Sequence, residues 1–284
     1  MNISIFDEQS CILGEGPLWA HDRLFWVDIK DKKIYARGLQ EAQAQCWSFS
    51  NRPSALGMSQ TSKHILLVAF EKELAFFDVR TGIIHHTVPY NDRAGNRSND
   101  GACGPDGAFW FGTMDDAEQE KTGELFRYDG SNLTLQESKI GISNTVVWSP
   151  DGKWMYFADS MEQCIWRYRF DAGKGQIGEK EVFVSLKGTS IYPDGSTIDA
   201  HGFLWNAQWD GSRVVRYSPA GEIDKVIELP VSKPTCCAFG GPDFQHLFVT
   251  TASIDTSNPL AGKTFVIEDA GQGFAEHKFT GEVL

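Results

Sequence analysis

The chain has 284 residues, of which 41% are hydrophobic, so it is long enough to bury a substantial core in one large domain or two small ones. Its formal net charge of −12 argues against a surface for nucleic acid or for an anionic membrane, because both partners require a basic stripe. The acidic balance is otherwise ordinary for a soluble protein.

The amino-terminal segment and the cysteines indicate the compartment. The first residues, MNISIFDEQS, lack the basic and apolar regions of a secretory signal, and no apolar run approaches the ~18 residues of a membrane span. The six cysteines show neither a CxxC pair nor a zinc-finger spacing. We therefore expect a cytoplasmic protein with reduced thiols, in which Cys236 and Cys237 serve packing rather than redox chemistry.

Six apolar, strand-like runs follow one another along the chain and start about every 40–49 residues. In chain order they are LFWVD at 24–28, ILLVAF at 65–70, FWFGTM at 109–114, WMYFAD at 154–159, FLWNAQW at 203–209 and HLFVTTA at 246–252. A tight-turn signal such as PDG precedes most of them, and a second strand-like segment follows most of them. Convincing amphipathic helices are absent.

A repeat of this length that is built from short strands is typical of a β-propeller blade. Six repeats predict an all-β, six-bladed β-propeller that occupies residues 1–284 as a single domain around a central channel. The alternative fold, a large β-sandwich, would not repeat one turn–strand pattern six times. We expect the ring to close by pairing of ISIF, at 3–6, with strands of the last blade.

Polar side chains recur at one offset from the turns. Four oxygen-bearing residues stand eight positions ahead of the turn residue in their repeats, namely Glu15, Asn99, Asn144 and Asp194. The second and sixth repeats carry Ala55 and Cys237 at this offset. Because the innermost strand of each blade lines the channel, equivalent positions should point towards one axis at similar height.

Convergence of these four side chains favours a metal site. Two carboxylates placed close together without a partner would repel each other and lose hydration, and a bound cation removes both costs. Oxygen ligands suit a divalent ion such as Ca²⁺, Zn²⁺, Mn²⁺, Mg²⁺ or Fe²⁺, without deciding among them. Each residue alone could instead be a turn former, but four residues in one frame favour the metal site.

Two neighbours of Asn99 are also candidates for the site. Arg97 lies two positions earlier and so should share the face of Asn99 on a strand, where it could grip oxygen atoms of a ligand. Asp100 should face away and could orient Arg97. A Ser–His–Asp arrangement, a GxSxG elbow and a Walker-type loop are absent.

Over nearly its full length the sequence resembles the SMP-30/gluconolactonase/LRE family. The resemblance is carried by LGEGPLW at 13–19, NRSNDGACGPDGAFWFGTM at 96–114, GISNTVVWSPDG at 141–152 and YPDGSTIDAHGFLWNAQWDGSRVVRYSPAG at 192–221. It implies a six-bladed propeller with one divalent metal ion in the channel. It further implies that Glu15, Asn144 and Asp194 hold the metal, and that Arg97 and Asn99 contact the substrate.

The family's activity implies hydrolysis of a sugar aldonolactone to the aldonic acid, with Asp194 as the general base. The loop at 113–124, which is short and acidic, and the segment at 52–57 are candidates for the wall that reads sugar hydroxyls. Pentono- and hexonolactones both stay open. We expect a monomer or a weak homodimer, with no nucleic-acid or membrane partner.

Two other functions stay open at this point. An organophosphate or aryl-ester hydrolase could use the same metal on a similar propeller with a more apolar pocket. A non-catalytic propeller that binds metal for a regulatory role would need neither a base beside the metal nor an arginine over it, so Asp194 and Arg97 favour an enzyme.

Overall fold

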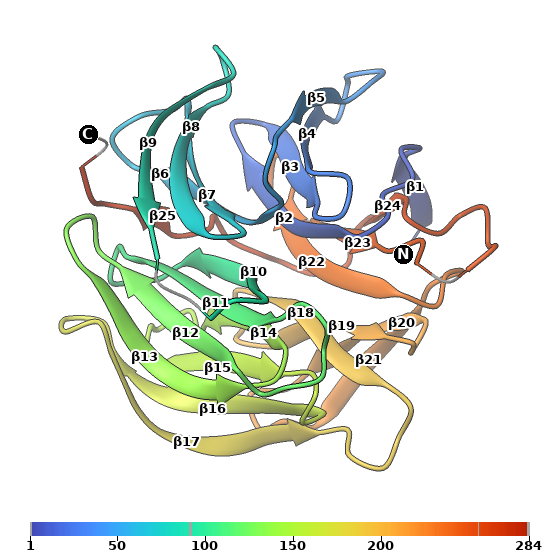
Figure 1. The fold of residues 1–284 in the computed structure, drawn as a ribbon. Helices are drawn as coiled ribbons and strands as arrows, with labels where there is room; N and C mark the ends of the chain where they lie inside the picture. The colour runs from blue at the N-terminus through green and yellow to red at the C-terminus, as the bar shows by residue number, and fades with distance from the viewer. Residues whose placement is uncertain (1, 91–92, 255, 283–284) are drawn as a thin grey trace.

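The computed structural model describes residues 2–90, 93–254 and 256–282. It is all β, with six sheets arranged as blades around a central axis (Figure 1). The predicted six-bladed β-propeller is therefore confirmed. None of the described residues forms a helix with the length and hydropathy of a membrane span.

The strands of each blade follow in sequence from the axis outwards. The innermost strands are β2 (Gly14–Ala20), β6 (Pro53–Ser59), β10 (Asn96–Cys103), β14 (Ser143–Trp148), β18 (Tyr192–Ile198) and β22 (Pro234–Gly240). The second strands are β3 (Arg23–Asp28), β7 (Ile65–Phe70), β11 (Phe109–Asp115), β15 (Trp154–Asp159), β19 (Leu204–Trp209) and β23 (His246–Thr251). All six predicted apolar runs therefore lie on second strands, which neighbouring blades cover on both faces.

The outer half of each blade is more exposed. The third strands are β4 (Lys33–Gly38), β8 (Glu73–Asp78), β12 (Gly123–Tyr128), β16 (Cys164–Asp171), β20 (Arg213–Tyr217) and β24 (Thr264–Ile267). The outermost strands are β5 (Gln45–Ser48), β9 (Ile83–Pro89), β13 (Leu133–Ile140), β17 (Gln176–Ser185), β21 (Ile223–Glu228) and β1 (Ile3–Asp7). We number the blades 1 to 6 by their innermost strands, from β2 to β22.

The amino-terminal strand closes the ring. β1 pairs antiparallel with β24, and Ile3, Ser4 and Ile5 lie opposite Ile267, Val266 and Phe265. Blade 6 therefore combines the two ends of the propeller sequence in one sheet, as predicted from ISIF. Each innermost strand contacts the next one round the axis, and β22 contacts β2, so the inner ring is continuous.

Aspartates in the turns that precede the apolar runs fasten the blades internally. Asp199 is fully buried and accepts hydrogen bonds from Trp205 Nε1 at 3.0 Å and from Arg216 Nη2 at 2.7 Å. Blade 3 repeats this arrangement around the turn Asp106, which accepts hydrogen bonds from a tryptophan and an arginine. In blades 3 and 5 the turn signal therefore marks a buried charge with fixed partners.

The carboxyl-terminal segment makes a second closure that was not predicted. Its strand β25 (Lys278–Phe279) pairs in parallel with β6 of blade 2, and Figure 1 shows this red end of the chain beside the teal strands. Phe279 is fully buried and stacks on Tyr128 of blade 3, with ring centroids 5.7 Å apart. The segment therefore links blade 6 to blades 2 and 3.

We expect Phe279→Ala to lower the free energy of unfolding by about 3–5 kcal/mol, because it removes a buried aromatic ring from between two blades. The measurement is a urea unfolding curve. Val182→Ala is the matched control, since the Val182 side chain belongs to a residue that is 53% exposed, and it should change stability by less than about 0.5 kcal/mol. A loss below 1 kcal/mol for Phe279→Ala would show that the segment adds little to the fold.

Candidate functional site

A cavity of about 700 Å³ opens at the end of the channel where the innermost strands begin. All five candidate residues from the sequence line it, namely Glu15, Arg97, Asn99, Asn144 and Asp194. They come from blades 1, 3, 4 and 5, and each is at least 93% buried. The structure therefore brings together the side chains that the repeat offset selected.

A β-bulge lies at this end of every innermost strand. The pairing with the second strand shifts after Glu15 in β2 and after Asn144 in β14. In β10 and β18 it shifts around Asn99 and Asp194 themselves. A bulge bends its strand and re-aims the side chains beside it, so these residues can turn towards the axis instead of following the pleat.

Glu15 and Asp194 form a strained electrostatic pair. Burial, and then the charge of Asp100, raise the pKa of Glu15 to about 8. Burial, and then the charge of Glu15, raise the pKa of Asp194 well above its ordinary value. Each carboxylate accepts one hydrogen bond, from the backbone N–H of the following glycine, at 3.0 Å and 3.1 Å. Neither carboxylate has an ion-pair partner within the part of the chain that the structure describes.

The two carboxamides are fixed by a chain of hydrogen bonds between blades. Asn99 Nδ2 donates to Asn144 Oδ1 at 3.1 Å and to the carbonyl of Ser143 at 2.8 Å. Asn144 Nδ2 donates to Ser160 Oγ at 2.9 Å, and this hydroxyl donates to the carbonyl of Pro193 at 2.6 Å. These contacts set the orientation of the Asn144 amide, so its oxygen faces Asn99 and the cavity.

Backbone strain accompanies the site at Thr145, which the sequence reasoning did not single out. Thr145 follows Asn144 and has a φ of 53°, a value that costs a β-branched residue about 1–3 kcal/mol. It is fully buried, and its hydroxyl donates to the carbonyl of Asp194 at 2.5 Å. Gly16 takes the same backbone conformation after Glu15, with a φ of 52°. Thr145 therefore links blades 4 and 5 next to the candidate ligands Asn144 and Asp194.

Arg97 and Asp100 point to opposite parts of the channel. Arg97 lines the upper cavity and donates from Nη1 to Asn99 Oδ1 at 2.6 Å. Asp100 instead faces a small cavity of about 40 Å³ lower in the channel, beside Glu276 and His277 of the carboxyl-terminal segment. The expectation that Asp100 faces away is confirmed, but the expectation that it orients Arg97 is wrong. The carboxylate that contacts the guanidinium is that of Asp116, at 2.9 Å.

The two predicted wall segments behave differently. The loop at 113–124 supplies Met114 and Glu118 to the cavity wall, as expected. The segment at 52–57 supplies no wall residue, although its Arg52 contacts Asp116 in that loop at 2.8 Å. The remaining wall, which the sequence did not predict, is largely apolar in blades 4 to 6 and includes Ile142, Met161, Tyr192, Trp209 and Ile254.

The donor set fits a divalent cation. Two buried carboxylates and a fixed carboxamide oxygen face one cavity, and these hard oxygen donors match Ca²⁺, Mg²⁺ or Mn²⁺ and are accepted by Zn²⁺. A cation would offset the cost of burial, and then the repulsion by neighbouring carboxylates, that together raise both carboxyl pKa values. The described residues contain no group of three or more His, Cys, Asp or Glu side chains arranged for a metal, so the carboxamide is essential to this set.

The sequence pattern of the SMP-30/gluconolactonase/LRE-like region matches residues 13–253. The chain belongs to this family. Members with similar sequences include an L-arabinolactonase of Azospirillum brasilense, which is 34% identical over 283 residues, 95% of this chain and 92% of the relative. Regucalcin of Macaca fascicularis is 31% identical over 96% of both chains.

Solved structures of the family agree with the fold. A protein described as a calcium-binding regucalcin from Agrobacterium tumefaciens superimposes with a TM-score of 0.90 at 31% identity. The match covers 97% of this chain and 96% of that one. The family likeness therefore extends over the whole propeller, including the four blades that carry the candidate site.

The raised carboxyl pKa values predict how stability depends on pH when divalent cations are removed by a chelator. A carboxyl group with a higher pKa in the folded state takes up a proton on folding, so stability falls as pH rises from about 4.5, the unfolded value for Glu15, to about 8. Each such group contributes up to about 1.4 kcal/mol per pH unit. The double variant Glu15→Gln/Asp194→Asn should show a flatter decline and exceed the wild type in stability at pH 8.

Thermal unfolding between pH 5 and 8, with chelator and with a divalent ion restored, measures this effect. The ion should recover stability at pH 8 in the wild type and much less in the double variant. Equal pH slopes for the two proteins would contradict the electrostatic strain at Glu15 and Asp194.

Proposed function

We propose that this protein hydrolyses a sugar aldonolactone to the aldonic acid, with one divalent cation held by Glu15, Asn144 and Asp194. The observation that carries the proposal is the pair of buried carboxylates without an ion-pair partner among the described residues, at the floor of a cavity of about 700 Å³ beside Arg97. The arabinolactonase and the calcium-binding regucalcin among the relatives support the substrate class and the cation respectively.

The cation, when bound, supplies Lewis acidity that polarises the lactone carbonyl or acidifies a water molecule. Asp194 accepts a proton from the attacking water, whose oxygen forms the new bond to the carbonyl carbon. The ring C–O bond then breaks, and the ring oxygen takes the proton and leaves as a hydroxyl of the open-chain acid. The product carries a carboxylate, which the Arg97 guanidinium balances.

Arg97 and Asn99 hold the substrate oxygen atoms. Arg97 Nη1 donates hydrogen bonds to the carbonyl of Ser98 at 3.0 Å and to Oδ1 of Asn99 at 2.6 Å. Nε donates to Asp116, which leaves the two N–H groups of Nη2 without a partner among the residues described. In a buried cavity, such charge-assisted donors bind the oxygen atoms of the substrate strongly.

The cavity wall suits a sugar ring. Blades 1 and 3 present Lys30, Arg97 and Glu118, while blades 4 to 6 present a mainly apolar wall that includes Trp209, together with Lys233. A sugar lactone has a hydroxylated edge and an apolar face of C–H groups, so one ring can satisfy both sides. The pentono- and hexonolactones are both small enough for this volume.

The first prediction of this proposal is acid release from aldonolactones by the purified protein. A pH-indicator assay with five- and six-carbon lactones, after chelation and with each divalent ion restored, should show metal-dependent turnover above spontaneous hydrolysis. Aryl esters and organophosphates are the comparison substrates. Turnover of those alone would move the assignment to an ester hydrolase, and no turnover of any substrate would favour a non-catalytic metal-binding propeller.

Substitution of Asp194 separates its two roles. Asp194→Asn keeps an oxygen donor but cannot accept the proton, so kcat should fall by about 10²–10⁴-fold while the divalent ion still binds. Asp194→Ala should lose both. Calorimetric titration of the metal and initial rates measure the two effects, and near wild-type kcat in Asp194→Asn would show that another group is the base.

Asn99→Ala is the companion variant. It should retain the cation and lose rate, since Asn99 is assigned to the substrate. Loss of the cation would mean that Asn99 is a fourth protein ligand.

A further inference from the structure

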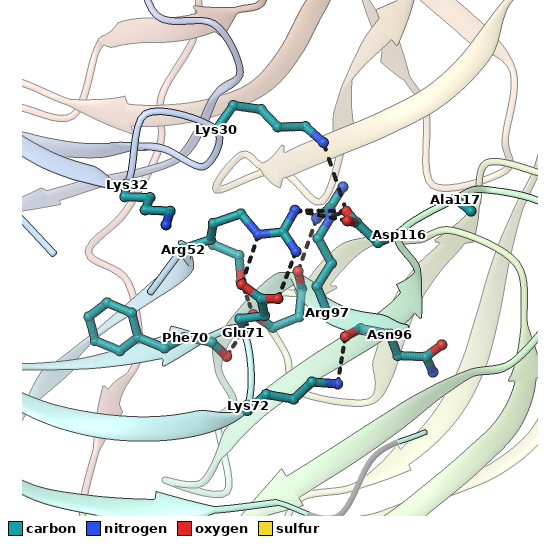
Figure 2. Close-up of polar contacts among 12 residues, drawn as sticks. Lys30, Lys32, Arg52, Phe70, Glu71, Lys72, Asn96, Arg97, Asp116 and Ala117 are labelled. Carbon is teal, nitrogen blue, oxygen red and sulfur yellow. Dashed lines mark hydrogen bonds and ion pairs between the residues drawn. The ribbon is translucent and has the colours of Figure 1, made fainter. Parts of the chain in front are cut away.

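The carboxylate of Asp116 lies at the centre of a group of charged side chains, of which Lys30 and Arg97 line the cavity (Figure 2). It accepts a hydrogen bond from Arg97 Nε at 2.9 Å and two from Arg52 Nη1, at 2.8 Å and 3.0 Å. Lys30 Nζ lies 3.8 Å from the same carboxylate. Three cations from three blades therefore share one acidic group.

Arg52 is itself held from the other side. Glu71 accepts hydrogen bonds from Arg52 Nε at 2.9 Å and from Nη2 at 2.8 Å, which is a bidentate contact. The Arg52 guanidinium is thus clamped between Glu71 and Asp116, as Figure 2 shows. Blade 2 supplies no residue to the cavity wall, but through this clamp it fixes the carboxylate that contacts Arg97.

Arg97 depends on this carboxylate for its position. Its side chain is only 4% exposed, and burial lowers the pKa of the guanidinium. The Arg52 guanidinium nearby adds repulsion. Without Asp116, Arg97 would keep only the two contacts of Nη1, to Ser98 and Asn99, and would face a second guanidinium with no acid between them.

The loop that carries Asp116 is held in place by other contacts. The carboxylate of Asp115 accepts hydrogen bonds from the backbone N–H groups of Gln119 and Glu120, at 2.9 Å and 3.1 Å. The backbone N–H of Asp116 donates to the carbonyl of Gly95 at 3.0 Å. Removal of the Asp116 side chain should therefore leave the loop folded.

We propose that Asp116 is a positioning residue, which holds the Arg97 guanidinium so that Nη2 faces the substrate. The inference rests on the proposed lactone hydrolysis. It adds a role that neither the repeat offset nor the family motifs assign, and it explains why the partly buried Arg52–Glu71 pair lies beside the cavity.

The test compares Asp116→Ala with two other variants. Asp116→Asn keeps Oδ1 as an acceptor for Arg97 Nε. Glu120→Ala truncates an exposed acidic side chain of the same loop that does not line the cavity. Asp116→Ala should raise KM for the lactone about tenfold or more, with kcat within about threefold and the affinity for the divalent ion unchanged. Asp116→Asn should recover most of the loss, and Glu120→Ala should stay within about twofold of the wild type.

A double-mutant cycle and a spectroscopic signal complete the test. In an Arg97→Lys background, Asp116→Ala should have little further effect on KM, because the contact it removes is already lost. The Nε–H resonance of Arg97, assigned by its absence in Arg97→Lys, should be protected from solvent exchange in the wild type and lose protection in Asp116→Ala.

Several outcomes would overturn the inference. They are a lower kcat with unchanged KM in Asp116→Ala, an equal effect of Glu120→Ala, or an Arg97 signal that is unchanged by Asp116→Ala. The signal decides the position of Arg97 even if the wild type hydrolyses no lactone. Absence of lactone hydrolysis by the wild type would contradict the proposed function, whereas the Arg97 signal would still test whether Asp116 positions Arg97.

Discussion

Closure of the ring is the constraint on which the rest of the structure depends. Each second strand is buried on both faces, which requires a blade on either side. The last blade lacks its outermost strand until β1 pairs with β24, so the two ends of the propeller sequence complete one sheet. Once the ring is closed, the ends of the six innermost strands meet at the axis. Ring closure therefore determines which of their side chains lie next to one another.

The side chains at the axis cost stability. Glu15 and Asp194 are buried together, and Thr145 between Asn144 and the backbone of Asp194 adopts a φ that disfavours a β-branched residue. A protein selected for stability alone would place apolar side chains at these positions, as the second blade does with Ala55. Buried carboxylates and backbone strain lower stability, and their concentration in one small region of a well-packed propeller is typical of a functional site.

Much of this fold could be predicted from the sequence because a propeller repeats. The six apolar runs give blade number and order, and the turn signals set a common frame in which Glu15, Asn99, Asn144 and Asp194 align. This alignment of the repeats predicts where each side chain lies along its strand, but it does not predict the backbone conformation at that position. The bulges, which decide how each of these side chains meets the axis, depend on hydrogen bonds between strands and leave no repeated residue pattern.

Contacts between blades were the part that the sequence could not provide. Asp116 looks like an ordinary acidic loop residue, and Arg52 lies 64 positions before it, in a segment predicted to line the cavity rather than to support it. Asp100 was assigned to Arg97 because the two are close in sequence, yet Asp100 lies within the bulge of β10 and lines the smaller cavity lower in the channel. A pairing between distant loops is visible only once the blades are placed round the axis.

The cavity therefore has two kinds of wall, and they are built by different means. Blades 4 to 6 present mainly apolar side chains beside the candidate ligands, together with Lys233. Blades 1 and 3 contribute charged side chains, and a series of ion pairs extends behind Arg97: Glu71 holds Arg52, Arg52 holds Asp116, and Asp116 holds Arg97. Since a long side chain with a free charge would sample many rotamers, this succession of ion pairs gives a flexible arginine the fixed geometry that substrate recognition needs.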